Sequence, residues 1–275
     1  MSTIALAMEG LPGNLVDRLG AIADAGFDAI EIDLQDLSRA GNLKTTLKAL
    51  RQSPLNIVAA KGLRDFTGHV GHVLDYRMNL ARESINLMNE LECPLLIAQP
   101  SALNKTVHVS ELVSQLSALA NLAMLRGVNI AYRPLCWSDH AYDIVSAWHL
   151  IEQAGNRNLG LVFDSFQSLT DLDSAHSLER VPADRIWSLR LSGFRASALH
   201  VLEDKIDVDR HQRYFPRAEN LSRELVRVIS QLVISSNSCQ TVISGNVESY
   251  RMQGLESTLE SAQSSREEMN KILFE

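Results

Sequence analysis

Residues 15–32 have the sequence LVDRLGAIADAGFDAIEI and hold one complete helix–strand unit. In Leu15–Ala25 the apolar residues recur at helical spacing, so we expect a helix with one buried face. Gly26 ends this helix, because glycine is typical of the position just beyond the last helical turn. The residues that follow, Phe27–Ile32, are mainly apolar and predict a strand. The stretch therefore predicts a helix followed at once by a strand.

The same alternation of short apolar runs and longer amphipathic runs continues along the chain. Strands are predicted at Thr3–Met8, Phe27–Ile32, Leu55–Ala60, Pro94–Ala98, Val128–Tyr132, Leu159–Phe163, Ile186–Leu191 and Thr241–Ser244. Helices are predicted at Leu15–Ala25, Leu43–Arg51, Asp75–Leu91, Ser110–Arg126, Tyr142–Ala154, Ala218–Val233 and Leu255–Leu273, with a short turn at Ala175–Glu179. This order indicates an α/β fold, a closed (β/α)8 TIM barrel, with residues 1–275 as a single domain. The glycine-rich loop of an open dinucleotide-binding sheet is missing after the first strand.

The composition argues against several classes of protein. The chain has 275 residues, of which 45% are hydrophobic, so it can bury a core without metals or disulfides. Its net charge of −7 argues against general attraction to nucleic acid or to an anionic membrane. Three cysteines are too few for a disulfide framework, which predicts reduced thiols and a cytoplasmic location. No apolar run approaches the ~20 residues that span a bilayer.

Charged and polar side chains stand at or just beyond the ends of the predicted strands. They are Glu31, Lys61, Arg64, Gln99, Arg133, Asp164, Arg190 and Ser244. In a parallel barrel these ends meet at one mouth, where active sites lie, and a buried charge there needs a partner or a ligand. We therefore expect a functional site at the mouth. The alternative is a structural network in which Glu31 and Asp164 pair with the arginines and Lys61.

Four short motifs resemble one known family. They are Ala25–Glu31 (AGFDAIE), Leu63–Phe66 (LRDF), Leu161–Phe166 (LVFDSF) and Arg210–Pro216 (RHQRYFP). In this order and spacing they resemble the sugar phosphate isomerase/epimerase superfamily of xylose-isomerase-like barrels, above all its 3-dehydroshikimate dehydratase branch. The resemblance implies a divalent metal held by two glutamates, an aspartate and a histidine or glutamine. Such a metal polarises the substrate carbonyl for isomerisation or β-elimination.

The chain departs from this pattern at most of the metal ligands. Asp164 matches the family's aspartate, but other positions are replaced: Arg133 for a glutamate, Arg190 for a histidine or glutamine, Ser244 for a glutamate, Gln167 for a histidine and Lys61 for a glutamine. A guanidinium has no lone pair and stays protonated, so it repels a divalent cation instead of binding it. We therefore predict that the metal site is lost and that no cofactor is required.

The replacements predict a metal-independent lyase or isomerase. Arg133 and Arg190, expected near Asp164, can hold a developing oxyanion. Asp164, Glu31 or His140 moves the proton; the resemblance implies the role of His140. The substrate is a small anionic or polyoxygenated metabolite, and the residues predicted to bind it are Lys61, Arg64, Gln99, Gln167, Arg210, His211 and Ser244. The long connection Phe194–Arg217 is a candidate active-site loop.

Two alternatives stay open at this point. A catalytically dead pseudoenzyme that binds a ligand or a partner would also have lost its metal ligands. A metal-dependent 3-dehydroshikimate dehydratase with relocated ligands would need a substitute such as Glu248, four residues beyond Ser244. A mouth filled with internal salt bridges would favour the pseudoenzyme, whereas an open polar mouth would favour an enzyme. The resemblance also implies a homodimer.

Overall fold

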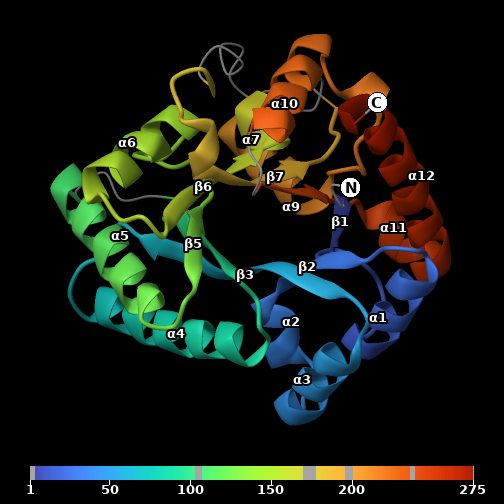
Figure 1. Ribbon diagram of the computed structural model, residues 1–275, viewed down its shortest axis with the longest axis horizontal. Helices are drawn as coiled ribbons and strands as arrows, with labels where there is room; N and C mark the ends of the chain where they lie inside the picture. Colours follow the sequence, from blue (N-terminus) through green and yellow to red (C-terminus); the bar gives the residue numbers. More distant parts are fainter. Residues whose placement is uncertain (1–3, 103–106, 170–177, 196–200, 236–238, 275) are drawn as a thin grey trace. The chain divides into compact units, whose positions relative to one another are not determined.

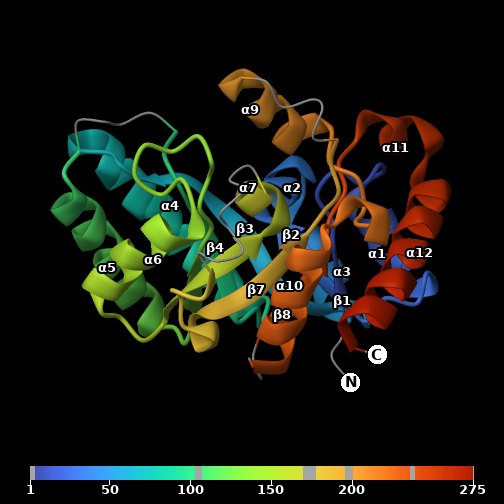
Figure 2. The same cartoon turned by 90° about the horizontal axis from the view of Figure 1, so that it is seen from above.

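Strands and helices alternate along the chain, and eight parallel strands follow one another in the order of a closed barrel (Figures 1 and 2). The computed structural model describes residues 4–102, 107–169, 178–195, 201–235 and 239–274. The predicted (β/α)8 fold class is confirmed. The expected extent of the domain, residues 1–275, stays a prediction. The chain forms two compact units, one made of Met1–Val58 and Leu189–Glu275 and the other of Ala59–Ser188.

The first unit holds β1 (Ile4–Ala7) between β2 (Ala29–Asp33) and β8 (Gln240–Ile243). Both neighbours run parallel to β1, and the register places Ala7 opposite Glu31. All residues of β1 and β2 are buried. This is typical of parallel sheets, whose two faces are both covered, and it explains why β1 is apolar throughout; in β2 it buries two charged residues, Glu31 and Asp33.

Two helices of the first unit begin directly after an asparagine that caps them. The side chains of Asn14 and Asn42 each accept a hydrogen bond from a backbone N–H of the first turn that follows. The helix α12 packs against α1, α10 and α11. The bounds in this unit are α1 Leu15–Asp24, α2 Leu34–Arg39, α3 Leu43–Gln52, α9 Leu202–His211, α10 Arg223–Ser235, α11 Glu248–Gln253 and α12 Leu255–Phe274.

The second unit holds most of β3 and the strands that follow it. The strand β4 pairs in parallel with β3 and β5, and β5 pairs with β6. The helix α5 packs against α4 and α6. The bounds are β3 Asn56–Thr67, α4 Gly71–Glu90, β4 Leu95–Pro100, α5 Val109–Met124, β5 Asn129–Tyr132, α6 Ile144–Ala154, β6 Leu159–Asp164, α7 Ser165–Leu169 and β7 Ile186–Leu191. The strand β7 begins in the second unit, and from Leu189 on it belongs to the first unit.

Most predicted elements are found within a few residues of their expected bounds, but β3 is longer than expected. It continues through Lys61 and Arg64 to Thr67, where polar residues interrupt the apolar pattern on which the prediction relied. Its pairing with β4 shifts register between Lys61 and Leu63 and again between Leu63 and Thr67. Such irregularities re-aim side chains and are common beside functional sites.

The structure also differs from the sequence-based prediction in having short helices directly after strands. The helix α2 follows β2 at once because the Asp33 side chain accepts a hydrogen bond from the Gln35 backbone N–H at 2.9 Å. The connection predicted at Phe194–Arg217 contains α9, and its residues 196–200 lie outside the described part. The turn predicted at Ala175–Glu179 also lies largely outside it. No helix in the described part combines the length and the apolarity needed to cross a membrane.

The close approach of β6 to β7 at Gly160 gives a prediction for stability. A Cβ atom added at Gly160 would lie 2.5 Å from the Trp187 ring. We expect Gly160→Ala to lower the free energy of unfolding by about 1–3 kcal/mol, because the ring must shift out of its packed position. Chemical denaturation measures this. The matched control is Gly20→Ala in α1, where nothing lies within 4 Å of the added atom. That variant should keep or gain stability, and equal losses in both variants would contradict the packing argument.

Candidate functional site

A buried ion pair joins the ends of β5 and β6 in the second unit. Arg133 follows the last residue of β5, and Asp164 is the last residue of β6. The Arg133 Nε donates to Asp164 Oδ2 at 2.9 Å, and Nη2 lies 2.7 Å from the same oxygen. The other carboxylate oxygen, Oδ1, accepts the backbone N–H of Phe166 at 3.0 Å. The expected proximity of Arg133 to Asp164 is therefore found, and both side chains are almost fully buried.

Polar groups around this pair are also held by hydrogen bonds. The Gln167 side chain, on α7, accepts the backbone N–H of Cys136 at 2.7 Å and is buried. The Tyr132 hydroxyl lies 2.6 Å from the Thr67 hydroxyl, and burial raises the pKa of Tyr132 well above its ordinary value. His140 is half-buried in the connection that follows β5.

Three further predicted residues lie on neighbouring strands of the second unit. Lys61 and Arg64 belong to β3, and Gln99 belongs to β4. The side chains of Lys61 and Gln99 are buried, with exposed fractions of 4% and 6% for the residues, and Arg64 is half-buried. Lysine is rarely buried to this degree unless it is paired. The second unit thus contains three predicted cations, Lys61 and Arg64 on β3 and Arg133 just beyond β5.

A second buried cluster lies in the first unit and is centred on Arg190. One guanidinium nitrogen, Nη1, is ion-paired with Glu31 Oε1, and Nη2 lies 2.8 Å from Glu9 Oε2. Burial is the main reason why the pKa of Arg190 falls to about 10, and Glu9 opposes this shift. The guanidinium therefore stays protonated at neutral pH. The second oxygen of Glu31, Oε2, is buried and has no hydrogen-bond partner among the described residues.

Arg213 forms a neighbouring buried pair in the same unit. Its Nη1 lies 2.8 Å from Asp209 Oδ1, and its Nε donates to the Ser192 hydroxyl at 2.9 Å. The Asn246 side chain accepts the Arg213 backbone N–H at 3.0 Å. Arg213 also lowers the pKa of Arg190, because two positive charges lie close together. These contacts fasten the segment after α9 to the ends of β7 and β8.

The predicted site residues of the long connection are exposed, whereas the one that follows β8 is buried. Arg210 and His211 lie at the exposed carboxyl end of α9. Ser244 is buried just beyond β8, where its backbone N–H donates to the Leu191 carbonyl at 2.9 Å. Glu248, the substitute metal ligand considered above, is exposed at the start of α11.

Sequence reasoning missed Glu9 and did not assign a role to Arg213. Glu9 follows β1 after Met8, so the rule that selected Glu31 also applies to it. A glycine-containing stretch follows Glu9 directly, and it forms no motif that would mark Glu9 as part of a site. Arg213 lies in the RHQRYFP motif, and only the fold shows that it points inward whereas Arg210 and His211 are exposed.

The chemistry of the side chains at the positions where the resemblance implies metal ligands bears on the predicted loss of that site. Both Asp164 oxygens already accept hydrogen bonds, from Arg133 and from the Phe166 backbone. Arg133 and Arg190 have no lone pair to offer. Within the described residues no group of three or more His, Cys, Asp and Glu side chains is arranged to hold a metal ion. Metal independence itself stays a prediction.

The fold and the charged strand ends define a (β/α)8 barrel of the kind that carries its chemistry at the carboxyl ends of its strands. Residues 19–216 match the xylose isomerase-like TIM barrel family. The chain belongs to this family, and the resemblance stated above is confirmed.

Comparison with known proteins gives relatives of the same kind. The chain is 31% identical over 213 residues to a 3-dehydroshikimate dehydratase of Pseudomonas aeruginosa and 30% identical to one of Pseudomonas putida. Each match covers 77% of this chain and 33% of the relative, so the chain spans about a third of the length of these curated relatives.

Solved structures show the same fold. A fusion of a xylose isomerase-like TIM barrel with 4-hydroxyphenylpyruvate dioxygenase matches with a TM-score of 0.82 and 24% identity, over 98% of this chain and 43% of that one. The zinc-bound IOLI protein matches with a TM-score of 0.80 and 16% identity, over 99% and 100% of the two chains. A D-psicose 3-epimerase matches with a TM-score of 0.72 and 11% identity, over 98% and 99%.

The buried pair gives a second prediction. We expect Asp164→Asn to lower the free energy of unfolding by about 3–5 kcal/mol, because it leaves the buried Arg133 charge without its carboxylate. The matched control is Glu152→Gln, which removes a carboxylate from an exposed contact with His149 at 3.9 Å. That change should cost about 0–1 kcal/mol. Urea unfolding compares the two variants, and a small loss in Asp164→Asn would show that the pair does not support the fold.

Proposed function

We propose that this chain is a metal-independent enzyme of the lyase or isomerase type, derived from a 3-dehydroshikimate dehydratase-like ancestor. Its substrate is a small anionic or polyoxygenated metabolite. The observation that carries the proposal is the buried pair of Arg133 with Asp164, which stands where the family resemblance implies metal ligands. The enzymatic names of the curated relatives support the same class of chemistry.

Arg133 has the properties required to stabilise an oxyanion. The two contacts to Asp164 Oδ2 hold its guanidinium in one orientation, and burial removes most of the water that would screen its charge. A fixed cation of this kind stabilises negative charge that develops on a substrate oxygen, without reorganisation during the reaction. When a base removes a proton from the carbon beside a carbonyl, the charge that appears on the carbonyl oxygen is such a charge.

Among the proton-transfer candidates, the hydrogen-bond pattern favours Glu31 over Asp164. Both oxygens of Asp164 are already engaged, Oδ2 by the Arg133 guanidinium and Oδ1 by the Phe166 backbone N–H. Glu31 uses only Oε1 for Arg190, and Oε2 has no partner among the described residues. We therefore assign the proton acceptor to Glu31 Oε2, with Arg190 and Glu9 as positioning residues. When hydroxide then leaves the next carbon and takes up the proton held by Glu31, water is released and a dehydration is complete; return of that proton to another carbon instead completes an isomerisation.

The first test is turnover of 3-dehydroshikimate in the presence of EDTA, followed by the absorbance of the aromatic dehydration product. Activity that survives EDTA supports the proposal. We expect Glu31→Gln and Arg133→Ala each to lower kcat by about 10²-fold or more, because the first removes the proposed proton acceptor and the second removes the cation proposed to stabilise the oxyanion. The matched controls are the exposed Glu260→Gln and Arg126→Ala, which should leave kcat unchanged.

Other outcomes would decide against the proposal. Activity that EDTA abolishes and Mn²⁺ restores would support a metal-dependent dehydratase with relocated ligands. Activity that persists in Glu31→Gln would remove Glu31 from the mechanism. If cyclic hydroxy acids and sugar acids are not turned over, the metal-independent enzyme is rejected for these substrates.

One observation favours a second candidate, a pseudoenzyme that binds a ligand or a partner. The guanidinium groups of Arg133 and Arg190 are both ion-paired with buried carboxylates, so much of their charge is neutralised within the protein. Internal salt bridges of this kind also hold together a site that has lost its chemistry. Saturable binding of an organic acid without turnover would support this candidate. The homodimer and the cytoplasmic location belong to the proposal as well, and the three cysteines, which are not joined by disulfides, are consistent with a reducing compartment.

A further inference from the structure

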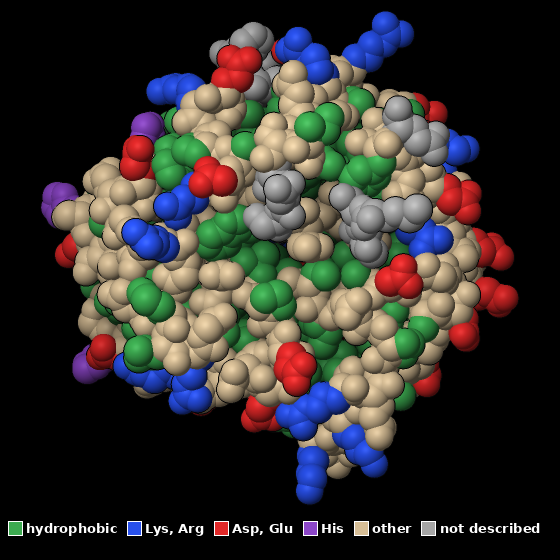
Figure 3. Space-filling view, viewed as in Figure 1, with side chains coloured by type: hydrophobic (Ala, Val, Ile, Leu, Met, Phe, Trp, Pro, Cys, Tyr) green, Lys and Arg blue, Asp and Glu red, His purple; other side chains and the backbone are tan. Residues whose placement is uncertain are grey.

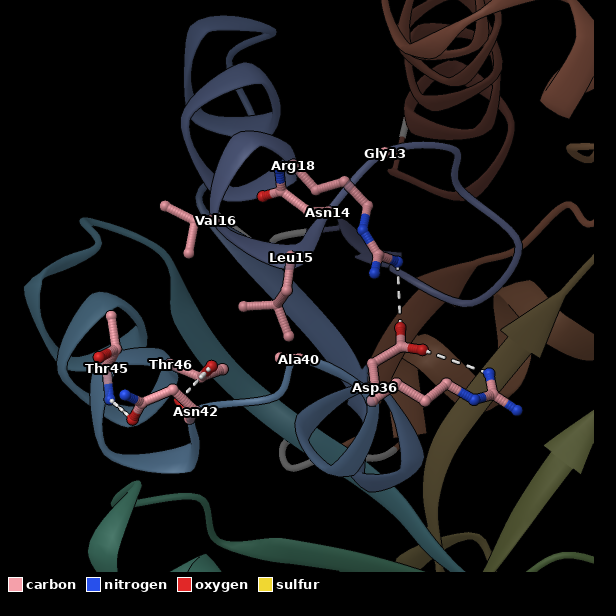
Figure 4. A pocket seen from close by; sticks show the side chains of 11 residues that line it. Gly13, Asn14, Leu15, Val16, Arg18, Asp36, Ala40, Asn42, Thr45 and Thr46 are labelled. Carbon is pink, nitrogen blue, oxygen red and sulfur yellow. Dashed lines mark hydrogen bonds and ion pairs between the residues drawn. The ribbon is translucent and has the colours of Figure 1, made fainter.

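A pocket of about 460 Å³ lies in the first unit, between the amino end of α1, the helix α2 and the amino end of α3 (Figure 4). None of its lining residues belongs to the strand-end clusters described above. Its volume lies within the range of about 300–1,000 Å³ that is typical of small-molecule sites. The pocket therefore has room for a ligand that the proposed function does not account for.

One end of the pocket carries an excess of positive charge. Figure 4 shows the guanidinium of Arg18 reaching one oxygen of Asp36, at 3.0 Å, and the Arg39 guanidinium lies 3.7 Å from the other oxygen. Two cations thus share one carboxylate. Arg18 is 7% exposed, and its Nε–H has no hydrogen-bond partner among the described residues. Arg39 has a side chain that is 74% exposed, so it can turn toward a ligand.

The wall beside this charged end is apolar. Leu15 and Val16 lie on the α1 side and Ala40 follows α2, whereas Thr45 and Thr46 stand on α3 across the pocket (Figure 4). Val16 is 48% exposed although it is apolar. A ligand body that covers Val16 would remove this apolar surface from water, which favours binding.

Basic side chains also gather outside the pocket on the same helix. Figure 3 shows Lys and Arg side chains over α3, where Lys44, Lys48 and Arg51 are all exposed. In a chain with a net charge of −7 this is a local exception. A positive patch attracts anions toward a nearby site and repels cations from it.

We propose that the pocket between α1, α2 and α3 binds a small organic anion, with its carboxylate at Arg18 and Arg39 and its apolar body against Leu15, Val16 and Ala40. If only the positive charge of the pocket mattered, inorganic phosphate would bind as well. If only its apolar wall mattered, a neutral ring would bind as well. The two features lie side by side, so the pocket selects a molecule that has both. This inference does not rest on the proposed function, because it uses none of the residues assigned to catalysis.

The test is isothermal titration of the whole chain with benzoate at low ionic strength. Benzamide, its neutral counterpart, and inorganic phosphate are titrated in parallel. We expect one benzoate site per chain, with benzamide and phosphate each at least about tenfold weaker. Arg39→Glu should weaken benzoate binding about fivefold or more, since it reverses a charge at the pocket. Val16→Phe should abolish binding, because the larger ring fills the apolar side.

Controls separate this pocket from any other anion site on the chain. Arg126→Glu reverses an exposed charge in the turn after α5, outside the pocket lining, and should leave benzoate binding unchanged. Circular dichroism checks that each variant is folded. Three results would overturn the proposal: no saturable benzoate binding, phosphate bound as tightly as benzoate, or binding that both pocket variants leave intact. The last result would place the anion elsewhere, and none of the three depends on whether the chain turns over a substrate.

Discussion

The interaction on which the strand ends of the second unit depend is the buried ion pair between Arg133 and Asp164. Neither charge can be removed from water without a large cost, and each is tolerated because the other lies within hydrogen-bond distance. The pair also decides what Asp164 can do. Arg133 contacts one oxygen of this carboxylate and the Phe166 backbone N–H contacts the other, so both oxygens are held in place.

In the first unit a buried guanidinium is likewise neutralised by carboxylates, but here two carboxylates contact one guanidinium. Arg190 is contacted by two carboxylates, Glu31 and Glu9, and a second guanidinium, Arg213, lies close by with its own partner Asp209. Because Arg190 contacts only one oxygen of Glu31, the other is left buried and without a partner among the described residues. The two carboxylates therefore differ in how their oxygens are engaged, and the proposed role of Glu31 as proton acceptor depends on this difference.

Much of the fold could be predicted from the sequence, and less of the site. The apolar runs that predicted β4, β5 and β6 are buried on both faces, so their pattern is strong. The prediction for β3 was too short because Lys61 and Arg64 break the pattern, although the backbone stays extended there. Arg133 and Asp164 were identified as neighbours from strand order and family resemblance. Glu9 also follows an apolar strand, but nothing in the sequence shows that its carboxylate pairs with Arg190.

By itself, the sequence determined the barrel class, the family and the strand-end residues, because periodicity, strand order and short motifs are local properties of the chain. Only the tertiary structure decided which charges are paired, since the partners of an ion pair can be far apart in sequence: Arg190 and Glu9 are 181 positions apart. It also decided that Arg213 is buried whereas Arg210 and His211 are exposed. Burial and pairing depend on how elements pack, and no local pattern carries that information.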